Sequence, residues 1–386
     1  SFALPRNPFM TQWLTQADCK AVMHSLFCAE LAAYRGEPVP GWQELQEIDS
    51  LERLHLAACV NEFFCLHETG LEDRLLMTYS FDEWVSFVAE AITETSGLTF
   101  RTSGSTGSPS AHFHRWEHIE AEANALARRL ASVMSMKRVI SWLPLHHLYG
   151  FMLGVALPCV AGVPRNAVSG VSLPGLSSGD LVVTVPPRWD YLARSNTLWP
   201  GHMAGVSSTA SLSPQTSSRL INQGLMGMLD IYGSTETGGV ATRWQHDMPY
   251  QLLCHWRQHD TQSIKRVDDN IITPLLDKAH WHNDTTFTLN GRHDGVVSIG
   301  GVNVSTSYVK QRLLSLESVK ECAVRTTGNP AQQRLKTFIV PASGQEPVAA
   351  QDIAQLIAKW PAAERPVSVT YGDALPTNAM GKLSDW

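Results

Sequence analysis

A short run rich in glycine and hydroxyl side chains, residues 102–109, constrains this chain more than any other feature. It reads Thr-Ser-Gly-Ser-Thr-Gly-Ser-Pro and follows a β-like run at residues 98–100. Glycines let a backbone approach an anion closely, and hydroxyl and N–H groups can then surround that anion with donors. Taken alone, the composition suits a polyphosphate loop but is also common in surface turns. The spacing G-x-x-x-x-G-K-[ST] is absent, which argues against a P-loop phosphotransferase.

Two later stretches strengthen the first interpretation. Residues 232–239 read Tyr-Gly-Ser-Thr-Glu-Thr-Gly-Gly and follow an apolar run at 225–231. Their carboxylate, Glu236, suits a hard cation such as the Mg²⁺ that accompanies a nucleotide. Residues 375–382 read Leu-Pro-Thr-Asn-Ala-Met-Gly-Lys, and Lys382 offers a cation that can reach a phosphate or carboxylate. Each stretch is ambiguous alone, whereas their order and separation are not.

In that order and separation, the three stretches resemble the ANL superfamily, which comprises acyl- and aryl-CoA synthetases, adenylation domains of peptide synthetases, and luciferases. The resemblance covers most of the chain from residue 98 to residue 386. Four further segments match the family's pattern: a P-x-x-H-x-x-G segment at 144–150, a small-residue stretch at 208–214, an arginine and hinge segment at 291–294, and a glycine loop at 300–304.

The resemblance implies an α/β fold with a large layered N-terminal domain, residues 1–292, and a small mobile αβ C-terminal domain, residues 293–386. The pattern agrees, because short apolar strands at 138–143 and 181–185 alternate with helical segments. The family's large domain usually has more chain before the phosphate loop, so a shortened N-terminal subdomain is expected. Apolar spacing predicts helices within 10–95 and at 116–134, 307–316 and 350–360, and β-like runs predict strands at 295–299, 323–326 and 337–340.

The same resemblance assigns roles to individual residues. It implies that the catalytic residues are Lys382, Thr235, Glu236 and His147, with Glu236 holding Mg²⁺ and His147 lining the acyl pocket. Asp294 is the expected hinge. The residues implied to bind the phosphates, adenine and ribose of ATP are Thr102, Ser103, Gly104, Ser105, Thr106, Gly107, Ser208, Thr209, Ala210, Tyr232, Gly233, Ser234, Asp277 and Arg292.

The implied reaction activates a carboxylic acid with ATP. Attack of the carboxylate on the α-phosphate gives an acyl-adenylate and pyrophosphate, so the enzyme must position and neutralise two approaching anions. Lys382 would bridge those anions. The small domain is then expected to turn about Asp294, which withdraws Lys382 and brings the loop at Gly300-Gly301 towards the site. A pantetheine thiol, of CoA or of an acyl carrier protein, would attack the acyl-adenylate.

The chain also departs from the family's pattern at Ser110 and before Asp277. Ser110 stands where the family carries lysine, and Arg101 or Arg115 is either a replacement for that cation or a solvated surface charge. The usual Thr-Gly before Asp277 is missing. These departures support a second hypothesis, a catalytically degenerate nucleotide-binding regulatory protein. Four residues argue against this hypothesis: Thr235, Glu236, Arg292 and Lys382. An enzyme that had lost its activity would not be expected to keep all of them.

The expected acyl pocket offers no dedicated cation for a second carboxylate, so an uncharged acid is expected. An aromatic acid such as a hydroxybenzoate suits a compact pocket with His147 and Tyr149 as polar handles. A small or medium aliphatic acid stays open. The expected lining residues are His147, Tyr149, Gly150, residues 206–210, Gly233 and Val240.

Histidine spacing suggests a metal site only weakly. His114 and His118, like His255 and His259, are four residues apart, as metal ligands on one helix would be. Neither pair has an obvious third ligand in the sequence. Exposed helical histidines are therefore the expectation for both pairs.

Composition excludes some function classes. The 30 basic and 36 acidic residues give no broad cationic surface, which argues against general nucleic-acid binding. The seven cysteines form no C-x-x-C pair, which indicates reduced thiols in a cytoplasmic protein. The apolar run at 149–163 is short and interrupted by glycine and proline, so it predicts a buried helix and no membrane insertion.

Overall fold

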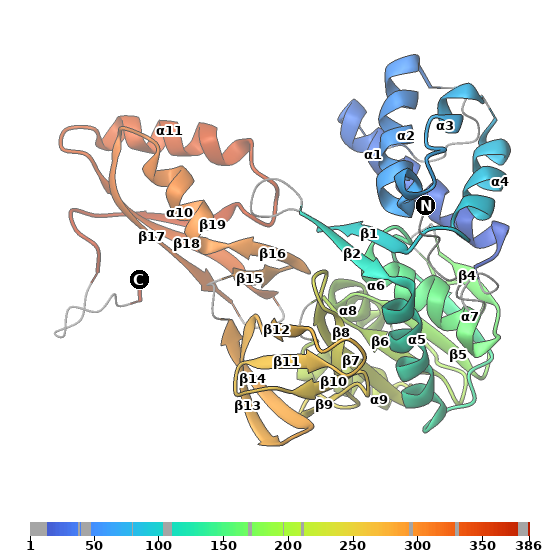
Figure 1. Cartoon of the computed structure of the whole chain (residues 1–386). Helices are drawn as coiled ribbons and strands as arrows, with labels where there is room; N and C mark the ends of the chain where they lie inside the picture. The colour runs from blue at the N-terminus through green and yellow to red at the C-terminus, as the bar shows by residue number, and fades with distance from the viewer. Residues whose placement is uncertain are drawn as a thin grey trace.

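Helices open the chain and form a layer at one end of the molecule, drawn in blue (Figure 1). The computed structural model describes residues 14–37, 39, 48–78, 80–102, 110–168, 172–195, 197–209, 212–292, 296–328, 332–376 and 385–386, and the side chains of 290–292 and 307 lie outside this description. The helical prediction for residues 10–95 is confirmed where they are described. The helices are α1 (Gln16–Arg35), α2 (Ser50–Phe64), α3 (Arg74–Met77) and α4 (Phe81–Ala91), with a 3₁₀ turn at Leu66–Glu68.

A β-hairpin connects this helical layer to the central sheet. We call the described residues up to 292 the large unit. Strands β1 (Gly97–Arg101) and β2 (Ala111–Arg115) pair antiparallel, and the predicted phosphate loop lies between them. Helix α5 (Trp116–Ala131) follows β2 without a break. The sequence predicted this helix, and the structure ends it three residues before the predicted end at 134.

A nine-stranded sheet forms the centre of the large unit (Figure 1). Its strand order is β13-β14-β9-β8-β7-β6-β5-β3-β4, with parallel pairing from β4 to β7 and antiparallel pairing from β7 to β13. The strands are β3 (Arg138–Ser141), β4 (Arg165–Ala167), β5 (Asp180–Thr184), β6 (Ala204–Ser207), β7 (Gly227–Ser234), β8 (Gly238–Arg243), β9 (Tyr250–Leu252), β13 (Asp277–Asn283) and β14 (Thr286–Arg292).

Strand β5 explains why this sheet needs helices on both faces. Leu181 and Val183 belong to the apolar cluster shared with α5, whereas Val182 between them belongs to a second cluster that contains Trp189. Successive side chains of a strand point to opposite faces, so a run without polar residues must be covered on each side. The covering helices are α6 (Leu148–Phe151), a π-helical turn at Met152–Ala156 and α7 (Leu157–Ala161), and on the other face α8 (Pro186–Arg194) and α9 (Pro214–Asn222).

The predicted buried helix at 149–163 is thus a run of three short helical segments within 148–161. Most of its apolar side chains are fully buried, among them Phe151, Val155 and Leu157. Within the described residues, no helix is both long enough and apolar enough to cross a membrane.

A small three-stranded sheet packs beside the antiparallel part of the large sheet (Figure 1). Its strands are β10 (Trp256–Gln258), β11 (Ser263–Arg266) and β12 (Ile272–Pro274). The sequence analysis did not predict these strands. Each is only three or four residues long, and such runs carry little periodicity.

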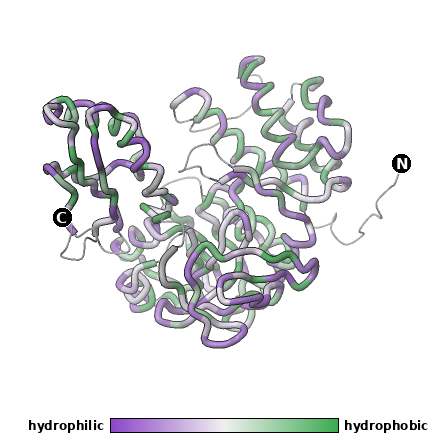
Figure 2. The backbone as a smooth tube through the Cα atoms, turned by 60° about the vertical axis from the view of Figure 1, so that its left-hand side comes forward, coloured by the Kyte–Doolittle hydropathy of each residue, from purple (hydrophilic) through white to green (hydrophobic). Residues whose placement is uncertain are grey.

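The C-terminal strands and helices, within residues 296–376, have a core of their own, and we call this part the small unit. Figure 2 shows it as a lobe at one side of the molecule. Val309, Leu313, Ile339, Ile353 and Trp360 are all buried in this core. The predicted strands and helices of this part are confirmed with shifted ends, whereas the division after residue 292 stays a prediction, because residues 293–295 lie outside the described part of the chain. The elements are β15 (Val296–Ile299), β16 (Val302–Ser305), α10 (Thr306–Leu314), β17 (Val319–Thr327), β18 (Arg334–Pro341), α11 (Glu346–Ala358) and β19 (Pro366–Tyr371).

A buried ion pair at the start of β5 gives a stability test of this fold. Asp180 is 2% exposed and accepts hydrogen bonds from Arg138 Nε (2.9 Å) and the Ser177 N–H (2.7 Å). Asp180→Ala leaves both donors without their partner and is expected to lower the free energy of unfolding by about 3–5 kcal/mol in a urea titration.

The exposed pair Lys20–Asp82 provides the control, since both side chains are more than half exposed. Asp82→Ala is expected to cost no more than about 1 kcal/mol. Equal losses in the two variants would contradict the assignment of Asp180 as a structural anchor.

Candidate active site

The stretch at 232–239 forms the hairpin turn between β7 and β8. Gly233 pairs with Gly239, and Ser234 pairs with Gly238. The Ser234 N–H donates to Thr237 Oγ1 (3.1 Å), and the Thr237 N–H donates to Ser234 Oγ (3.3 Å). Gly238 has a φ of +71°, and a Cβ on Gly233 would lie 2.1 Å from the Gly238 carbonyl oxygen, so the turn requires both glycines. The turn therefore holds its own hydroxyls and presents Glu236, whose side chain is 43% exposed, to solvent.

Strand β2 brings the stem of the phosphate loop to this turn. The buried His114 ring donates from Nε2 to the Thr235 carbonyl oxygen at 2.7 Å. Two residues earlier on the same strand, His112 Nε2 lies 3.7 Å from Glu236 Oε1. The structure thus places the strand that follows the first motif beside the second motif, although the two are more than a hundred residues apart in sequence.

The stem itself is closed by hydrogen bonds between its two ends. The Thr102 N–H donates to the Ser110 carbonyl oxygen (2.9 Å), and the Ser110 N–H donates to Thr102 Oγ1 (3.1 Å). Ser110 Oγ also lies 2.8 Å from His112 Nε2. The predicted phosphate-binding residues between these ends, Ser103, Gly104, Ser105, Thr106 and Gly107, lie outside the described residues.

The structure supports neither Arg101 nor Arg115 as a replacement for the lysine that Ser110 displaces. Arg101 forms an ion pair with Glu62, so its guanidinium already has an anionic partner. Arg115 pairs with Gly97 at the end of the hairpin remote from the loop. His112 is the basic side chain that the structure places between Ser110 and Glu236.

His147 begins α6 as its N-cap residue. Burial lowers the pKa of its imidazole, and nearby Glu30 acts in the opposite direction. Its neighbour His146 forms a hydrogen bond between Nδ1 and Ser25 Oγ (2.8 Å), and burial lowers the pKa of His146 to about 3. His146 is thus bonded to α1, while the acyl-pocket role of His147 stays a prediction.

Tyr149 is not available as the polar handle that the sequence suggested. Its hydroxyl lies 3.1 Å from the Thr184 carbonyl oxygen and 3.2 Å from that of Val206, so it donates to the backbone at the ends of β5 and β6. Burial raises the pKa of this phenol well above its ordinary value. That expectation was wrong because a sequence does not reveal which buried carbonyl a tyrosine will satisfy.

The expected adenine and ribose residues that the structure describes lie in or directly after strands of the central sheet. Ser208 Oγ donates to the Ile231 carbonyl oxygen (2.8 Å) at the start of the turn. The ring of Tyr232 packs edge-on against Phe287, with 5.9 Å between centroids. Asp277 and Arg292 are direct partners in the β13–β14 register, so the two expected ribose residues are neighbours in the backbone. Ala210 lies outside the described residues.

The small unit reaches the site through its glycine loop. A Cβ built on Gly301, in the β15–β16 turn, would lie 3.4 Å from Thr209 Oγ1. This is the loop that was expected to approach the site for thiol transfer. Asp294 and Lys382, the expected hinge and catalytic lysine, lie outside the described residues. In Figure 1 the last residue of the chain lies well away from β7 and β8.

Comparison with known families agrees with this geometry. A family profile described as "AMP-binding enzyme" matches residues 97–309, which include β1, the stem of the phosphate loop and the β7–β8 turn. The chain belongs to the ANL superfamily of adenylating enzymes.

Relatives of this ANL enzyme match it over nearly its whole length. A protein named 4-coumarate–CoA ligase from Halorhodospira halophila is 41% identical and covers 96% of this chain and 100% of its own. A protein of the same name from Cereibacter sphaeroides is 34% identical over 94% of this chain and 90% of its own. Among solved structures, an o-succinylbenzoate CoA synthetase from Bacillus subtilis has a TM-score of 0.60 at 16% identity, covers 95% of this chain and 92% of its own, and shows the shared fold.

The sequence analysis did not identify the side chains that bond the backbone of the β7–β8 turn in this ANL enzyme. The carboxylate of Glu122, on α5, accepts a hydrogen bond from the Gly239 N–H. A Cβ on Gly238 or Gly239 would lie 2.3 Å or 2.7 Å from its oxygens, so Glu122 occupies the space that the two glycines leave free. The signal was present, because Glu122 shares the buried face of α5 with Ile119 and Leu126, where an acid is unusual.

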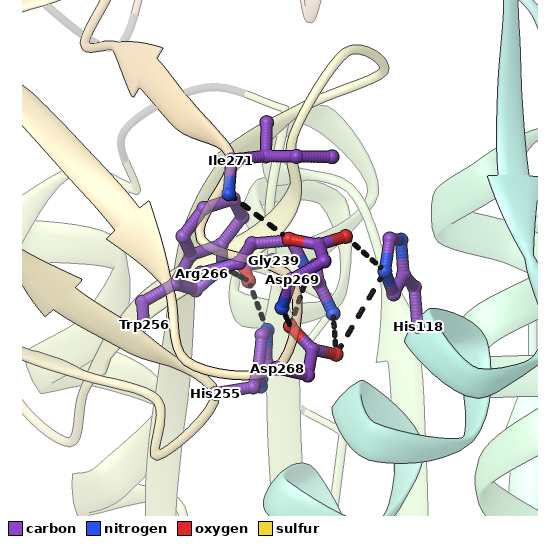
Figure 3. A network of polar contacts seen from close by, with 8 residues as sticks. All are labelled: His118, Gly239, His255, Trp256, Arg266, Asp268, Asp269 and Ile271. Carbon is purple, nitrogen blue, oxygen red and sulfur yellow. Dashed lines mark hydrogen bonds and ion pairs between the residues drawn. The ribbon is translucent and has the colours of Figure 1, made fainter.

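The Gly239 carbonyl is held by a second set of groups, from the segment around β10 (Figure 3). It accepts hydrogen bonds from His255 Nε2 (3.2 Å) and Trp256 Nε1 (3.0 Å). The guanidinium of Arg266 lies over the Trp256 ring, 4.9 Å from its centroid. Both backbone polar groups of Gly239 are therefore bonded to side chains, the N–H to Glu122 and the carbonyl to His255 and Trp256.

The expectation of exposed helical histidines was wrong for all four, since even His259, which is exposed, lies outside the helices. His114 and His255 are buried, the first on β2 and the second in a turn, and burial lowers the pKa of each to about 4. His118 lies on α5, but its Nε2 is 2.8 Å from Asp269 Oδ2. The i,i+4 spacing misled because His114 lies on a strand, so the pair does not share a helix face.

Metal-binding potential outside the turn is limited in the described chain. Two groups of three side chains bring potential ligand atoms within 4.8 Å of one another: Glu30, His55 and Cys59, and His118, Asp268 and Asp269. Each already contains a His–carboxylate ion pair, and Arg266 also bonds Asp268 (Figure 3). Neither includes Glu236, whose magnesium role stays a prediction.

The His114 contact predicts a loss of adenylation rate on substitution. His114→Ala leaves the Thr235 carbonyl without its donor and lets the turn shift, so acyl-adenylate formation is expected to fall about tenfold or more. His114→Gln can still donate an N–H and is expected to keep most of the rate. The exposed His259→Ala is the control, and equal behaviour of all three variants in a pyrophosphate-exchange assay would contradict the positioning role.

Glu122 predicts a pH dependence of stability. Burial raises the pKa of its carboxyl from 4.5 to about 7. Between these values the folded protein keeps a proton that the unfolded chain has released, so this group makes the free energy of unfolding fall by about 3 kcal/mol as the pH rises. Above the folded-state pKa the loss is complete.

Glu122→Gln cannot titrate and is expected to remove that slope, so its stability relative to wild type rises between about pH 5 and about pH 8. Urea titrations at both pH values measure the difference. The exposed Glu117→Gln on the same helix is the control. A pH slope unchanged in Glu122→Gln would show that the carboxyl titrates normally.

Proposed function

We propose that this chain activates 4-coumarate, or a closely similar hydroxycinnamic acid, with ATP and transfers the acyl group to CoA. The observation that carries the proposal is the near full-length similarity to proteins named 4-coumarate–CoA ligase, at 41% and 34% identity. The pocket residues led us to expect an uncharged aromatic acid. The names of these relatives favour 4-coumarate within that class.

The first half-reaction would take place at the β7–β8 turn. The carboxylate of the acid attacks the α-phosphorus of ATP, and the bond from that phosphorus to the bridging oxygen of pyrophosphate breaks. Thr235 supplies a hydroxyl for the α-phosphate, held in place because His114 fixes its carbonyl at 2.7 Å. Thr102 and Ser110, which are bonded to each other at the two ends of the glycine-rich loop, would lie on the side of the leaving pyrophosphate.

Magnesium fits the donors at the tip of the turn. Glu236 offers a partly exposed carboxylate, and Thr235, directly before it in the chain, carries a hydroxyl group. Hard oxygen donors of this kind suit Mg²⁺, which keeps several waters and binds through one or two carboxylates and the phosphates. When bound, the ion would neutralise phosphate charge as pyrophosphate leaves.

The second half-reaction would use the glycine loop of the small unit. The thiol attacks the acyl-adenylate carbonyl, the C–S bond forms, and AMP leaves with the electron pair of the C–O bond. Gly301 lies beside Thr209, an expected nucleotide residue, so a pantetheine arm could approach along this loop without meeting a side chain at that position. CoA is the proposed acceptor because the relatives are named CoA ligases, and an acyl carrier protein is the alternative.

An acid panel tests the proposal. The purified protein is incubated with ATP, Mg²⁺ and either CoA or a holo-carrier protein, and AMP and thioester are quantified for 4-coumarate, cinnamate, 4-hydroxybenzoate and an alkyl acid. The highest kcat/KM is expected for 4-coumarate with CoA. Glu236→Gln removes one negative charge from the turn and is expected to lower the rate at least about tenfold while leaving the fold intact.

The matched control is Glu117→Gln, an exposed glutamate on α5. AMP formation with a different acid class would contradict the proposed substrate. AMP formation with no acid at all would contradict the ligase proposal and favour the degenerate regulator.

A further inference from the structure

A histidine, a cysteine and a glutamate from two neighbouring helices meet in the N-terminal helical layer. His55 and Cys59 lie one turn apart on α2, and Glu30 lies on α1, which runs beside α2 (Figure 1). The Nε2 atom of His55 lies 2.9 Å from Glu30 Oε2 and 3.7 Å from Cys59 Sγ. The three side chains belong to one of the two groups whose potential ligand atoms all lie within 4.8 Å of one another. None of the three is among the residues expected to bind ATP, magnesium or the acid.

A second contact between the same helices fixes this meeting. Arg35, in the last turn of α1, donates to both carboxylate oxygens of Glu52, in the first turn of α2, at 2.6 and 2.9 Å. A helix rises about 1.5 Å per residue, so Glu30 lies about 7.5 Å back along α1 from this contact. On α2, His55 and Cys59 lie about 4.5 Å and about 10.5 Å forward from it. The antiparallel helices therefore hold Glu30 level with the space between the other two side chains.

The three atoms match the ligands of a zinc ion in kind and in spacing. Proteins bind Zn²⁺ tetrahedrally through imidazole nitrogen, thiolate sulfur and carboxylate oxygen. The usual bond lengths place the nitrogen about 3.6 Å from the sulfur and about 3.4 Å from the oxygen. The observed 3.7 Å and 2.9 Å therefore need to change by no more than about 0.5 Å to accept the ion.

Neighbouring side chains hold the ligands in place. Cys59 is 8% exposed, and the ring of Tyr34 packs against that of His55 with 5.6 Å between centroids. Glu62, three residues after Cys59, forms an ion pair with Arg101, which balances the positive charge of that arginine. The site is thus set among ordered groups and keeps an overall negative ligand set.

The second group of potential ligands, His118, Asp268 and Asp269, is less suited to zinc. It offers no sulfur atom. Arg266 bonds Asp268 there, with 3.2 Å between Nε and Oδ1, so an ion would meet a fixed positive charge. The sulfur-containing group on α1 and α2 is therefore the better candidate.

We propose that Glu30, His55 and Cys59 form a zinc site that joins α1 to α2. His55 binds the ion through Nε2, and Cys59 binds it as a thiolate after its proton passes to solvent. The Glu30 carboxylate turns from His55 to the ion, and a water molecule takes the fourth position, which three protein ligands leave open. The inference does not rest on the proposed function, because it assigns these residues no step of acid activation.

A zinc titration of the full-length protein tests the site. The protein is treated with a chelator and a reductant, and Zn²⁺ alone is added in competition with a chromophoric chelator. One zinc ion per chain is expected to bind at this site. Loss of an outer partner of a metal ligand already weakens binding by about 10- to 100-fold. Cys59→Ser is therefore expected to weaken zinc binding about 100-fold or more, and Glu30→Gln about tenfold or more.

Cobalt identifies the ligands. A thiolate bound to Co²⁺ gives a charge-transfer absorption band in the near ultraviolet, which is expected in the wild type and absent from Cys59→Ser. The matched control is Cys28→Ser on α1, because Cys28 Sγ lies 3.8 Å from His24 Nδ1 at the same four-residue spacing but outside the three-ligand group. This control is expected to keep both the band and the zinc affinity.

Thermal melting gives an independent readout. An ion that binds only the folded protein stabilises it, so zinc is expected to raise the melting temperature of the wild type and of Cys28→Ser but not that of Cys59→Ser. Melting without metal shows whether each variant is folded. A Cys59→Ser variant that binds zinc as tightly as the wild type, or a wild-type cobalt complex without the thiolate band, would overturn the proposal.

Discussion

The β7–β8 turn depends on one constraint, the satisfaction of its buried backbone groups by side chains from other elements. The Thr235 carbonyl is held by His114 from β2, the Gly239 N–H by Glu122 from α5, and the Gly239 carbonyl by His255 and Trp256. A buried carbonyl or N–H without a partner lowers the stability of a protein by about 1–3 kcal/mol. Each of these contacts therefore stabilises the observed conformation of the turn. A turn fixed in advance can present Thr235 and Glu236 without reorganising during the reaction.

The same constraint explains why the parts of the large unit come in this order. The predicted phosphate loop lies in sequence between β1 and β2, and β2 carries His114, which bonds the Thr235 carbonyl. Helix α5 begins directly after that strand and supplies Glu122 six residues into its length. One short segment, residues 97–131, thus provides both a phosphate-loop stem and the support for the turn that faces it.

The sequence could predict the elements whose signals are local. The hydroxyl and glycine run at 232–239 is typical of a tight turn, and the apolar strands β3 and β5 are evident from their composition. It could not predict that Tyr149 donates to Thr184 and Val206 or that His114 faces Thr235, because these partners are 35, 57 and 121 residues away. The sequence could have indicated Glu122 as unusual, because it is an acid on the apolar face of a helix. Its partner, the Gly239 N–H on β8, could be identified only from the structure.

The account's central claim is that the turn of Thr235 and Glu236 and the stem at Thr102 and Ser110 face the same nucleotide. A crystal structure of the protein with a non-hydrolysable 4-coumaroyl-adenylate analogue tests this most directly. The account predicts the phosphate-like group within about 3 Å of the Thr235 hydroxyl and the adenine against Tyr232. An analogue bound elsewhere on the chain, or one that contacts only one of the two segments, would contradict it.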